Sequence, residues 1–305
     1  MSKKINILIT GANGQLGREL QDYLSLSPEI APLIFADFFA TDQQELDICD
    51  NAAIDSFMSK KKVDVIVNCA AFTAVDKAEE APAQSDKVNR VATGNLARAA
   101  KERGALLIHL STDYVFDGKG PTPYTEEDIP NPTGVYGKTK YAGEREILDS
   151  GAKYIIIRTS WLYSIYGNNF VKTILDLSTS RDKLNVVFDQ IGTPTYAPDL
   201  AKVIVSFISL YIQNYRDEET ADLTGVYHFS NEGVCSWYDF AVEIVKLSCS
   251  NCIVTPVTSD LFPTKAQRPP YSVMNKAKIT STLSLKIPHW RESLNVFYRQ
   301  YKNLK

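Results

Sequence analysis

Apolar and polar positions along the first half of the chain form two alternating patterns. Short runs rich in β-branched residues are expected to be strands, and each is followed by apolar residues at helical spacing. The strand runs are continuously apolar, which is typical of strands buried on both faces. This order predicts a parallel sheet with helices on both of its faces. The expected elements are the strands 5–10, 33–37, 63–71 and 105–112 and the helices 17–25, 51–60 and 84–104.

The pattern loosens after the apolar run at 153–161. Loops rich in Pro, Asn and Tyr then alternate with expected helices at 169–180, 198–213 and 236–248. No repeat or flexible linker separates the two halves. We therefore predict an α/β protein with a Rossmann-type doubly wound parallel sheet in residues 1–157. A smaller C-terminal substrate lobe is expected in residues 158–305, with some segments returning to the first domain.

Composition and charge narrow the classes of partner. The 305 residues are 44% hydrophobic and 23% charged, as in an ordinary globular protein with enough chain for a sizeable core. The formal net charge of −3 gives no reason to expect nucleic acid as a partner. No apolar run reaches the roughly 20 residues that span a bilayer, and no secretory signal precedes the first strand. We therefore predict a cytoplasmic protein that binds neither nucleic acid nor membrane.

The cysteines and histidines do not suggest a metal site. The five cysteines are scattered and odd in number, which suits a reducing compartment. Only Cys249 and Cys252 have a spacing that metal or redox sites use. A structural zinc site would need two further ligands, and the three histidines stand alone in the sequence. We predict that no metal is bound.

A glycine-rich turn joins the first expected strand to the first helix. Gly11, Gly14 and Gly17 have the spacing G-x-x-G-x-x-G. Such glycines let the backbone turn tightly and approach a pyrophosphate, whose charge the helix N-terminus favours. Because this turn opens the first of several strand–helix–strand units, it predicts a dinucleotide site. The residues expected to bind the cofactor here are Gly11, Asn13, Gly14, Gln15, Leu16 and Gly17.

Further cofactor residues are expected after the second and third strands. Asp37 ends the second expected strand, where a carboxylate commonly binds a ribose 2′-OH and disfavours a 2′-phosphate. Asp47 and Ile48 are expected to flank the adenine. The small residues Ala70 and Ala71 follow the third strand, where the cofactor should cross the sheet. The choice between NADPH and NADH stays open, because an aspartate at a strand end also suits exposure to solvent.

A threonine, a tyrosine and a lysine form a candidate proton donor. Thr112 follows Ser111 at the carboxyl end of the fourth strand. Tyr136 and Lys140 lie one turn apart on the next helix, so their side chains share a face. An ammonium close to the phenol favours the phenolate, which predicts a lowered pKa for Tyr136. Thr112 would share a substrate carbonyl oxygen with Tyr136 beside the hydride of the cofactor. Tyr141 is interpreted as structural.

These motifs, in this order, resemble the extended short-chain dehydrogenases/reductases, a superfamily that acts largely on nucleotide sugars. Further blocks are similar to those of the dTDP-4-dehydrorhamnose reductase family. The resemblance extends from residue 5 to about residue 290, and the blocks after residue 157 distinguish this family within the superfamily. The blocks are GANGQLG, NCAAFTAVDKAE, STDYVFDG, PTGVYGKTKYAGE, RTSWLY, NNF, DQIGTPT and RPPYSVMN.

The resemblance implies the reduction of a keto group on a nucleotide sugar. NADPH or NADH would deliver hydride to C4 of dTDP-4-dehydro-L-rhamnose, which would give dTDP-L-rhamnose. Tyr136 would donate the proton to the C4 oxygen, and Thr112 would hold that oxygen. Lys140 would bind the hydroxyls of the nicotinamide ribose and tune the tyrosine.

The resemblance also assigns residues around the substrate. Thr73 would lie near the cofactor, and Trp161 would form a wall of the sugar pocket. Arg268 would pair with the substrate diphosphate, a natural partner for a guanidinium group. Asn169 would either reach the nucleotide or cap the helix that follows it. The residues expected to bind substrate are Val75, Thr112, Asp113, Tyr136, Trp161, Asn169 and Arg268.

Family members differ in their use of NADPH or NADH, and some bind Mg²⁺ through acidic residues at a dimer contact. A homodimer is therefore compatible with the resemblance. The sequence has no convincing acidic cluster of this kind, so the prediction of no metal stands.

Two other functions stay open at this point. One is a nucleotide-sugar 4-epimerase or dehydratase of the same fold. Dehydratases typically carry an acidic pair after the strand-end threonine, whereas here Asp113 is followed by Tyr114. The other is a non-catalytic protein that resembles the regulatory β subunit of methionine adenosyltransferase, which has a similar tyrosine–lysine segment. Thr112 and Trp161 favour the reductase over that subunit.

Overall fold

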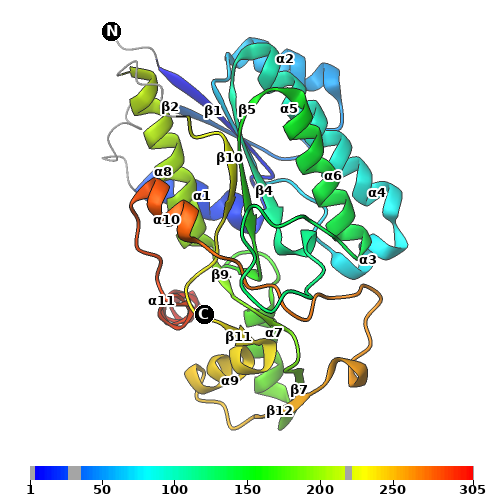
Figure 1. The fold of residues 1–305 in the computed structure, drawn as a ribbon. Helices are drawn as coiled ribbons and strands as arrows, with labels where there is room; N and C mark the ends of the chain where they lie inside the picture. Colours follow the sequence, from blue (N-terminus) through cyan, green and yellow to red (C-terminus); the bar gives the residue numbers. More distant parts are fainter. Residues whose placement is uncertain (1–3, 27–35, 217–221, 305) are drawn as a thin grey trace.

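The computed structural model describes residues 4–26, 36–216 and 222–304 (Figure 1). Its central feature is a six-stranded parallel sheet with the order β10-β5-β4-β3-β1-β2. The predicted doubly wound α/β fold is therefore confirmed. The strands are β1 (Ile5–Thr10), β2 (Ala36–Thr41), β3 (Val65–Asn68), β4 (Leu106–Thr112), β5 (Lys153–Thr159) and β10 (Gly225–His228).

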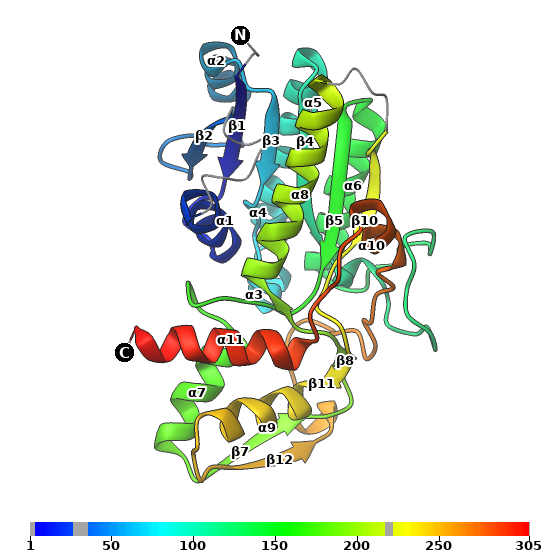
Figure 2. The ribbon, with the colours of Figure 1, turned by 90° about the vertical axis from the view of Figure 1, so that its left-hand side faces the viewer.

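Helices cover both faces of the sheet, because successive strand residues point to opposite sides (Figure 2). In β3, Val65 and Val67 belong to one core and Ile66 belongs to the other. Helices α1, α8 and α10 close the first core, and α2, α5 and α6 close the second. These helices are α1 (Gln15–Leu26), α2 (Asn51–Lys61), α5 (Ala92–Arg103), α6 (Val135–Ser150), α8 (Ala197–Arg216) and α10 (Ala277–Leu283).

The helix expected at 84–104 contains a π-helical turn. α4 (Pro82–Asp86) leads into this turn, Lys87–Val91, and then into α5. Asn89 lies in the turn, and its side-chain amide accepts from the N–H of Phe72 (2.8 Å) and donates to the carbonyl of Phe72 (3.1 Å). The turn thereby fixes the loop after β3, which borders the crevice described below.

A second, smaller core lies beyond the carboxyl ends of the sheet strands (Figures 1 and 2). Aromatic side chains dominate it, including the buried Tyr163, Phe240 and Trp290. Its main elements are α7 (Phe170–Ser180), α9 (Trp237–Leu247), α11 (Trp290–Asn303) and the parallel pair β7 (Lys183–Val187) and β12 (Ile253–Val257). Short elements complete the chain: α3 (Val75–Glu80), β6 (Leu162–Tyr163), β8 (Ile191–Gly192), β9 (Thr195–Tyr196), β11 (Cys235–Ser236) and 3₁₀ turns at Asp113–Val115 and Ser259–Leu261.

The chain crosses between the two cores more than once. Strand β10 pairs with β5, and helices α8 and α10 pack on the sheet, although all three follow residue 157. The three helices expected in the second half correspond to α7, α8 and α9. A division of the chain at residue 157 stays a prediction. None of the helices in the described ranges is long and apolar enough to cross a membrane.

The expected strand 33–37 is misplaced. Residues 33–35 lie outside the described residues, and β2 begins at Ala36 and ends at Thr41. Every residue of β2 pairs with β1, from Ala36 opposite Ile5 to Thr41 opposite Thr10. The length of β1 therefore decides where β2 ends, and this moves the carboxyl end of the strand past Asp37.

Candidate active site

The candidate site lies at the carboxyl ends of β1, β3 and β4. The strand order reverses beside β1, since β2 lies on one side of it and β3 lies on the other. In open α/β sheets, ligands bind in the crevice at such a reversal. The glycine turn, the loop after β3 and the end of β4 all meet there.

The glycine turn after β1 is packed too closely for side chains. Gly11 has a φ of +65°, and a Cβ on it would lie 2.6 Å from the backbone nitrogen of Ala70. A Cβ on Gly17 would lie 2.4 Å from the carbonyl oxygen of Gly11, and the N–H of Gly14 donates to that same oxygen (3.0 Å). The turn therefore presents backbone groups without side chains at the start of α1, and such a surface fits a pyrophosphate.

The other predicted residues of this turn differ in their burial and in their hydrogen bonds. Leu16 is buried in the core, so only its backbone faces the turn. Asn13 is exposed, and its N–H donates to Asp42 (3.1 Å). The side-chain oxygen of Gln15 accepts a hydrogen bond from Asn169 (3.0 Å), which links the turn to the start of α7.

Asp37 does not lie beside the crevice, which corrects its assignment to the cofactor. It is the second residue of β2, opposite Asn6 at the amino edge of the sheet, and its carboxylate pairs with Lys4. Asp42 directly follows β2, and its Oδ2 accepts the N–H of Asn13 in the glycine turn. The carboxylate that directly follows β2 beside the glycine turn is therefore Asp42, and it was not predicted because the expected strand ended too early.

The remaining predicted cofactor residues lie along the same edge of the sheet. Asp47 is half-buried and accepts the N–H of the residue two positions on (2.9 Å), whereas Ile48 is buried in the core under α2 and α5. Ala70 and Ala71 directly follow β3 and are half-buried, and Thr73 is exposed in the next loop. Ala70 is the residue that the glycine turn approaches most closely.

Thr112 and Tyr136 come together at the carboxyl end of β4. Burial raises the pKa of Tyr136 to about 12, a hydrogen bond with Thr112 acts in the opposite direction, and the charge of Asp113 adds to the rise. The ring of Tyr114 packs edge-on against Tyr136, with centroids 5.5 Å apart. The phenol is therefore protonated at neutral pH, as a proton donor must be.

The pKa of Tyr136 is raised and not lowered as the sequence suggested, because burial of the phenol dominates. Lys140 is itself buried. Its Nζ donates to the carbonyl of Leu110 (2.5 Å) and lies 3.2 Å from Nε2 of His109. Burial lowers the pKa of Lys140 to about 8, and the carboxylate of Glu144 opposes that shift. No local pattern pointed to His109, because a single histidine in an apolar strand has no partner until β4 and α6 pack together.

Asp113 has the properties of a buried acid. Burial raises its pKa to about 6, while hydrogen bonds with Ser272 and Thr112 lower it. Its Oδ1 accepts a hydrogen bond from the hydroxyl of Thr112 (3.0 Å). Asp113 therefore orients the threonine that contacts Tyr136, and Ser272 joins the site from a distant part of the chain.

Trp161 is held by a second indole. Its ring stacks on that of Trp237 with centroids 3.6 Å apart and an interplanar angle of 11°. On the other side lies Gly192, where a Cβ would come within 2.7 Å of the indole. Trp161 also has a φ of +48°, which is rare for a bulky residue. The wall expected from Trp161 is thus a two-ring stack, and Trp237 had not been predicted.

Asn169 caps helix α7. Its Oδ1 accepts the N–H of Lys172 (3.1 Å), and its Nδ2 donates to the carbonyl of Ser164 (2.7 Å) as well as to Gln15. Of the two roles expected for Asn169, its contacts within the protein are those of a helix cap. A direct role toward a nucleotide stays a prediction.

Arg268 forms a two-pronged ion pair with Asp76 at the start of α3 (3.2 and 2.7 Å). Val75, the first residue of α3, precedes that aspartate. Arg268 also lines a cavity of about 950 Å³ between α7, β7 and the 3₁₀ turn at Ser259–Leu261. Aromatic and basic side chains line the same cavity, among them Phe170, Trp237, Arg181 and Lys183.

Comparison with known proteins identifies the family. The sequence model described as RmlD substrate binding domain matches residues 5–303. A dTDP-4-dehydrorhamnose reductase of Aggregatibacter actinomycetemcomitans is 40% identical over 294 residues, which cover 94% of this chain and 96% of that protein. The chain belongs to the dTDP-4-dehydrorhamnose reductase family.

Solved structures of dTDP-4-dehydrorhamnose reductases have the same fold over the whole chain. The enzyme of Clostridium acetobutylicum is 43% identical with a TM-score of 0.88, covering 98% of this chain and 100% of that one. The enzyme of Bacillus anthracis is 38% identical, also with a TM-score of 0.88, covering 97% and 99%, and was solved in complex with NADP.

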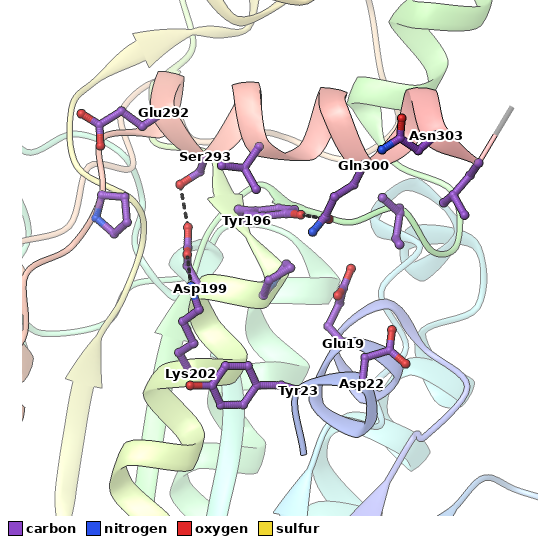
Figure 3. Close-up of a pocket in the computed structure, with 15 residues that line it drawn as sticks. Glu19, Asp22, Tyr23, Tyr196, Asp199, Lys202, Glu292, Ser293, Gln300 and Asn303 are labelled. Atoms are coloured by element: carbon purple, nitrogen blue, oxygen red, sulfur yellow. Dashed lines mark hydrogen bonds and ion pairs between the residues drawn. The ribbon is translucent and has the colours of Figure 1, made fainter. Parts of the chain in front are cut away.

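A second cavity, of about 690 Å³, has several carboxylates around it. It lies between α1, α8 and α11, and Figure 3 shows Glu19, Asp22, Asp199 and Glu292 around it. Three of these carboxylates already have partners, since Ser164 donates to Glu19 (2.5 Å), Tyr166 donates to Asp22 (2.5 Å) and Asn231 donates to Asp199 (2.9 Å). Across the described parts of the chain, no group of three or more acidic, histidine or cysteine side chains could hold a metal ion.

Proposed function

We infer that the protein reduces the C4 keto group of dTDP-4-dehydro-L-rhamnose to give dTDP-L-rhamnose, with NADPH or NADH as the reductant. The observation that carries this conclusion is the hydrogen bond between Thr112 and Tyr136 at the end of β4, with Lys140 one helical turn from Tyr136, in a chain that belongs to this reductase family over residues 5–303. A bound nicotinamide cofactor supplies the hydride that C4 receives.

The protein's own residues supply the proton and hold the reacting groups. Tyr136 gives its phenolic proton to the C4 oxygen as hydride arrives, since its raised pKa keeps the phenol protonated until charge develops on that oxygen. Thr112 has a single hydroxyl proton, which it gives to Asp113 in this structure (3.0 Å), and it would turn that proton to the same C4 oxygen when the sugar binds. Lys140 binds the nicotinamide ribose, and its positive charge when protonated assists the departure of the proton from Tyr136.

The cavity lined by Arg268 is the proposed site of the dTDP moiety. The rings of Phe170 and Trp237 offer faces for the thymine, with their own centroids 4.6 Å apart. Arg181, Lys183 and Arg268 offer positive charge for the diphosphate. Because Trp237 also stacks on Trp161, the same ring would contact the nucleotide on one side and support the sugar wall on the other.

A single assay separates this function from the two alternatives. The protein is mixed with a dTDP-4-keto-6-deoxyhexose and either NADPH or NADH, and the absorbance of the reduced cofactor is followed. A reductase oxidises one cofactor molecule for each sugar reduced. An epimerase returns the hydride and shows no net oxidation, and a regulatory subunit shows no turnover; either result would refute the proposal.

Cofactor preference is predicted to depend on Asp42 and not on Asp37. Asp42→Ser should shift the ratio of kcat/KM values toward NADPH by roughly tenfold or more, because it removes a negative charge from the expected position of the 2′-phosphate. Asp37→Ser is the matched control and should leave the ratio unchanged, since Asp37 pairs with Lys4 at the opposite edge of the sheet. An unchanged ratio in the Asp42 variant would contradict the assignment.

Arg268 is predicted to contribute to substrate binding and not to the chemical step. Arg268→Met should raise KM for the nucleotide sugar roughly ten- to hundredfold, equivalent to the loss of a charge-assisted contact of about 1.5–3 kcal/mol, with kcat little changed. Arg103→Met is the control, because Arg103 binds Ser59 at the far end of α5. A fall in kcat with constant KM would place Arg268 at the reacting centre instead.

Two expectations remain part of the proposal. A homodimer is compatible with the resemblance, and its test is the mass of the protein in solution by light scattering. A cytoplasmic location is supported by the five cysteines, all of which are free.

A further inference from the structure

A chain of fully buried polar side chains leads from the sheet to Lys140. Thr10 and Asn68 end β1 and β3, His109 lies in the middle of β4, and Lys140 lies on α6. None of the four is more than 1% exposed. Thr10 donates to Asn68 Oδ1 (2.8 Å), and Asn68 Nδ2 lies 3.0 Å from His109 Nδ1. His109 Nε2 in turn lies 3.2 Å from Lys140 Nζ. The proposed mechanism assigns no role to the first three of these residues.

The orientation of the Asn68 amide is fixed by a backbone group that can only donate. The N–H of Ala70 donates to Asn68 Oδ1 (3.2 Å), the same oxygen that receives the hydroxyl of Thr10. Turning the amide over would place its NH₂ against the N–H of Ala70, and both would be donors. Asn68 Nδ2 therefore faces His109 and donates to Nδ1.

The tautomer of His109 follows from that donor. A ring nitrogen that accepts a hydrogen bond carries no proton, so in the neutral imidazole the proton lies on Nε2. Burial and the nearby Lys140 hold the pKa of His109 well below its usual value, so the ring is neutral. The Nε2–H then points at Lys140 Nζ, which can accept it only as an uncharged amine with a free lone pair.

We propose that His109 is a positioning residue that donates its Nε2 proton to the uncharged form of Lys140 and so favours the neutral amine over the ammonium group. Lys140 then uses one of its own two protons on the carbonyl of Leu110 (2.5 Å), and the other is free to point toward the crevice. Protonation of Lys140 requires this network to rearrange, because an ammonium group and Nε2–H are both donors.

The other groups around Lys140 do not take over the effect of His109 on the protonation state of the lysine. The carboxylate of Glu144 favours the charged lysine, but it is already held by Arg158 (2.7 Å) and by Ser111 (2.5 Å). Cys69 is the other ionisable group near Lys140, and burial raises the pKa of its thiol to about 12, so it is uncharged at neutral pH. Burial and the imidazole proton therefore act together against the ammonium form.

The first test is a tautomer measurement that does not depend on activity. Two-bond ¹H–¹⁵N correlation spectra of the full-length protein distinguish Nδ1–H from Nε2–H imidazoles, and the chain has only three histidines. At a pH above 8, where Lys140 is largely uncharged, His109 is expected as the Nε2–H tautomer. His228 is an internal reference with the opposite expectation, since its Nδ1 faces the carbonyl of Tyr124 (3.2 Å) and must donate. An Nδ1–H or doubly protonated His109 would overturn the proposal.

The second test changes the donor that faces His109. Asn68→Asp replaces Nδ2 by an oxygen that accepts, so His109 should switch to the Nδ1–H tautomer and offer Nε2 to a charged Lys140. His109→Gln removes the fixed donor directly. His228→Gln is the control, because this equally buried histidine contacts Arg158 and Tyr124 and not Lys140.

The expected readout in these variants is the pH dependence of turnover. This part rests on the proposed function, in which a charged Lys140 assists Tyr136, so activity should fall as pH rises through the pKa of Lys140, near 8. In both variants the pH at which activity falls should rise by about one unit or more, and in His228→Gln it should stay the same. If the His109 tautomer switches but the pH at which activity falls does not change, the positioning role of His109 is refuted. Absence of turnover in the wild type would refute the proposed function and leave the tautomer result standing.

Discussion

Tyr136→Phe is expected to remove most turnover and to leave cofactor binding intact. General acid catalysis is typically worth about 10²- to 10⁴-fold, and the phenol is the proton donor in the proposed mechanism. The ring itself remains in the variant, so its edge-on packing against Tyr114 is preserved. The measurements are kcat with the dTDP-4-keto sugar and the Kd of the cofactor.

Tyr141→Phe is the matched control for this experiment. Tyr141 lies on the same helix, directly after Lys140, and packs with Val115, Phe116 and Tyr124 outside the catalytic contacts. The control should keep its turnover, since it loses one hydroxyl in a structural position. A Tyr136→Phe enzyme that retained more than half of the wild-type kcat would remove the tyrosine from the mechanism.

Arg158→Met is expected to destabilise the folded protein by about 3–5 kcal/mol, because it leaves a buried carboxylate without its partner. Arg158 binds Glu144 through two hydrogen bonds (3.0 and 2.7 Å), and the two side chains are 4% and 0% exposed. Ser111 also donates to Glu144 (2.5 Å), so this ion pair joins β4, β5 and α6 behind the active site. The measurement is the free energy of unfolding from urea denaturation.

The same helix provides a control in Arg145, which pairs with Asp149 at the surface. These two side chains are 54% and 66% exposed, so Arg145→Met should cost no more than about 1 kcal/mol. The double variant Arg158→Met/Glu144→Leu should recover part of the lost stability, since it removes the unpaired charge as well. Similar losses in Arg158→Met and Arg145→Met would contradict the argument.

The local patterns of the sequence were sufficient to predict the framework of the candidate site. The glycine turn is confined to seven consecutive residues, and its steric demands are visible without knowledge of the fold. Tyr136 and Lys140 share a helix, so their relation follows from helical geometry alone. Thr112 could be placed at the carboxyl end of a strand because the apolar run before it ends there.

The position of the ribose carboxylate could not be predicted in this way. The apolar run before Asp37 continues beyond it as Phe38, Phe39 and Ala40, and a strand with an aspartate inside it has no local signal for its end. Pairing with β1 extends β2 to Thr41. The pairing register between β1 and β2 decides where β2 ends, and it is a contact between segments that are distant in the sequence. For this reason the role predicted for Asp37 is now proposed for Asp42.

The sequence by itself determined the fold class, the dinucleotide turn and the tyrosine–lysine pair, because each depends on residues that are close along the chain. Only the tertiary structure decided which groups surround them. Trp237 stacks on Trp161, and Ser272 reaches Asp113, across long separations in sequence. The same holds for protonation: burial sets the pKa of Tyr136 near 12, and Lys140 faces His109 and Leu110. Desolvation and hydrogen-bond partners arise only when strands and helices pack, so no pattern along the chain could report them.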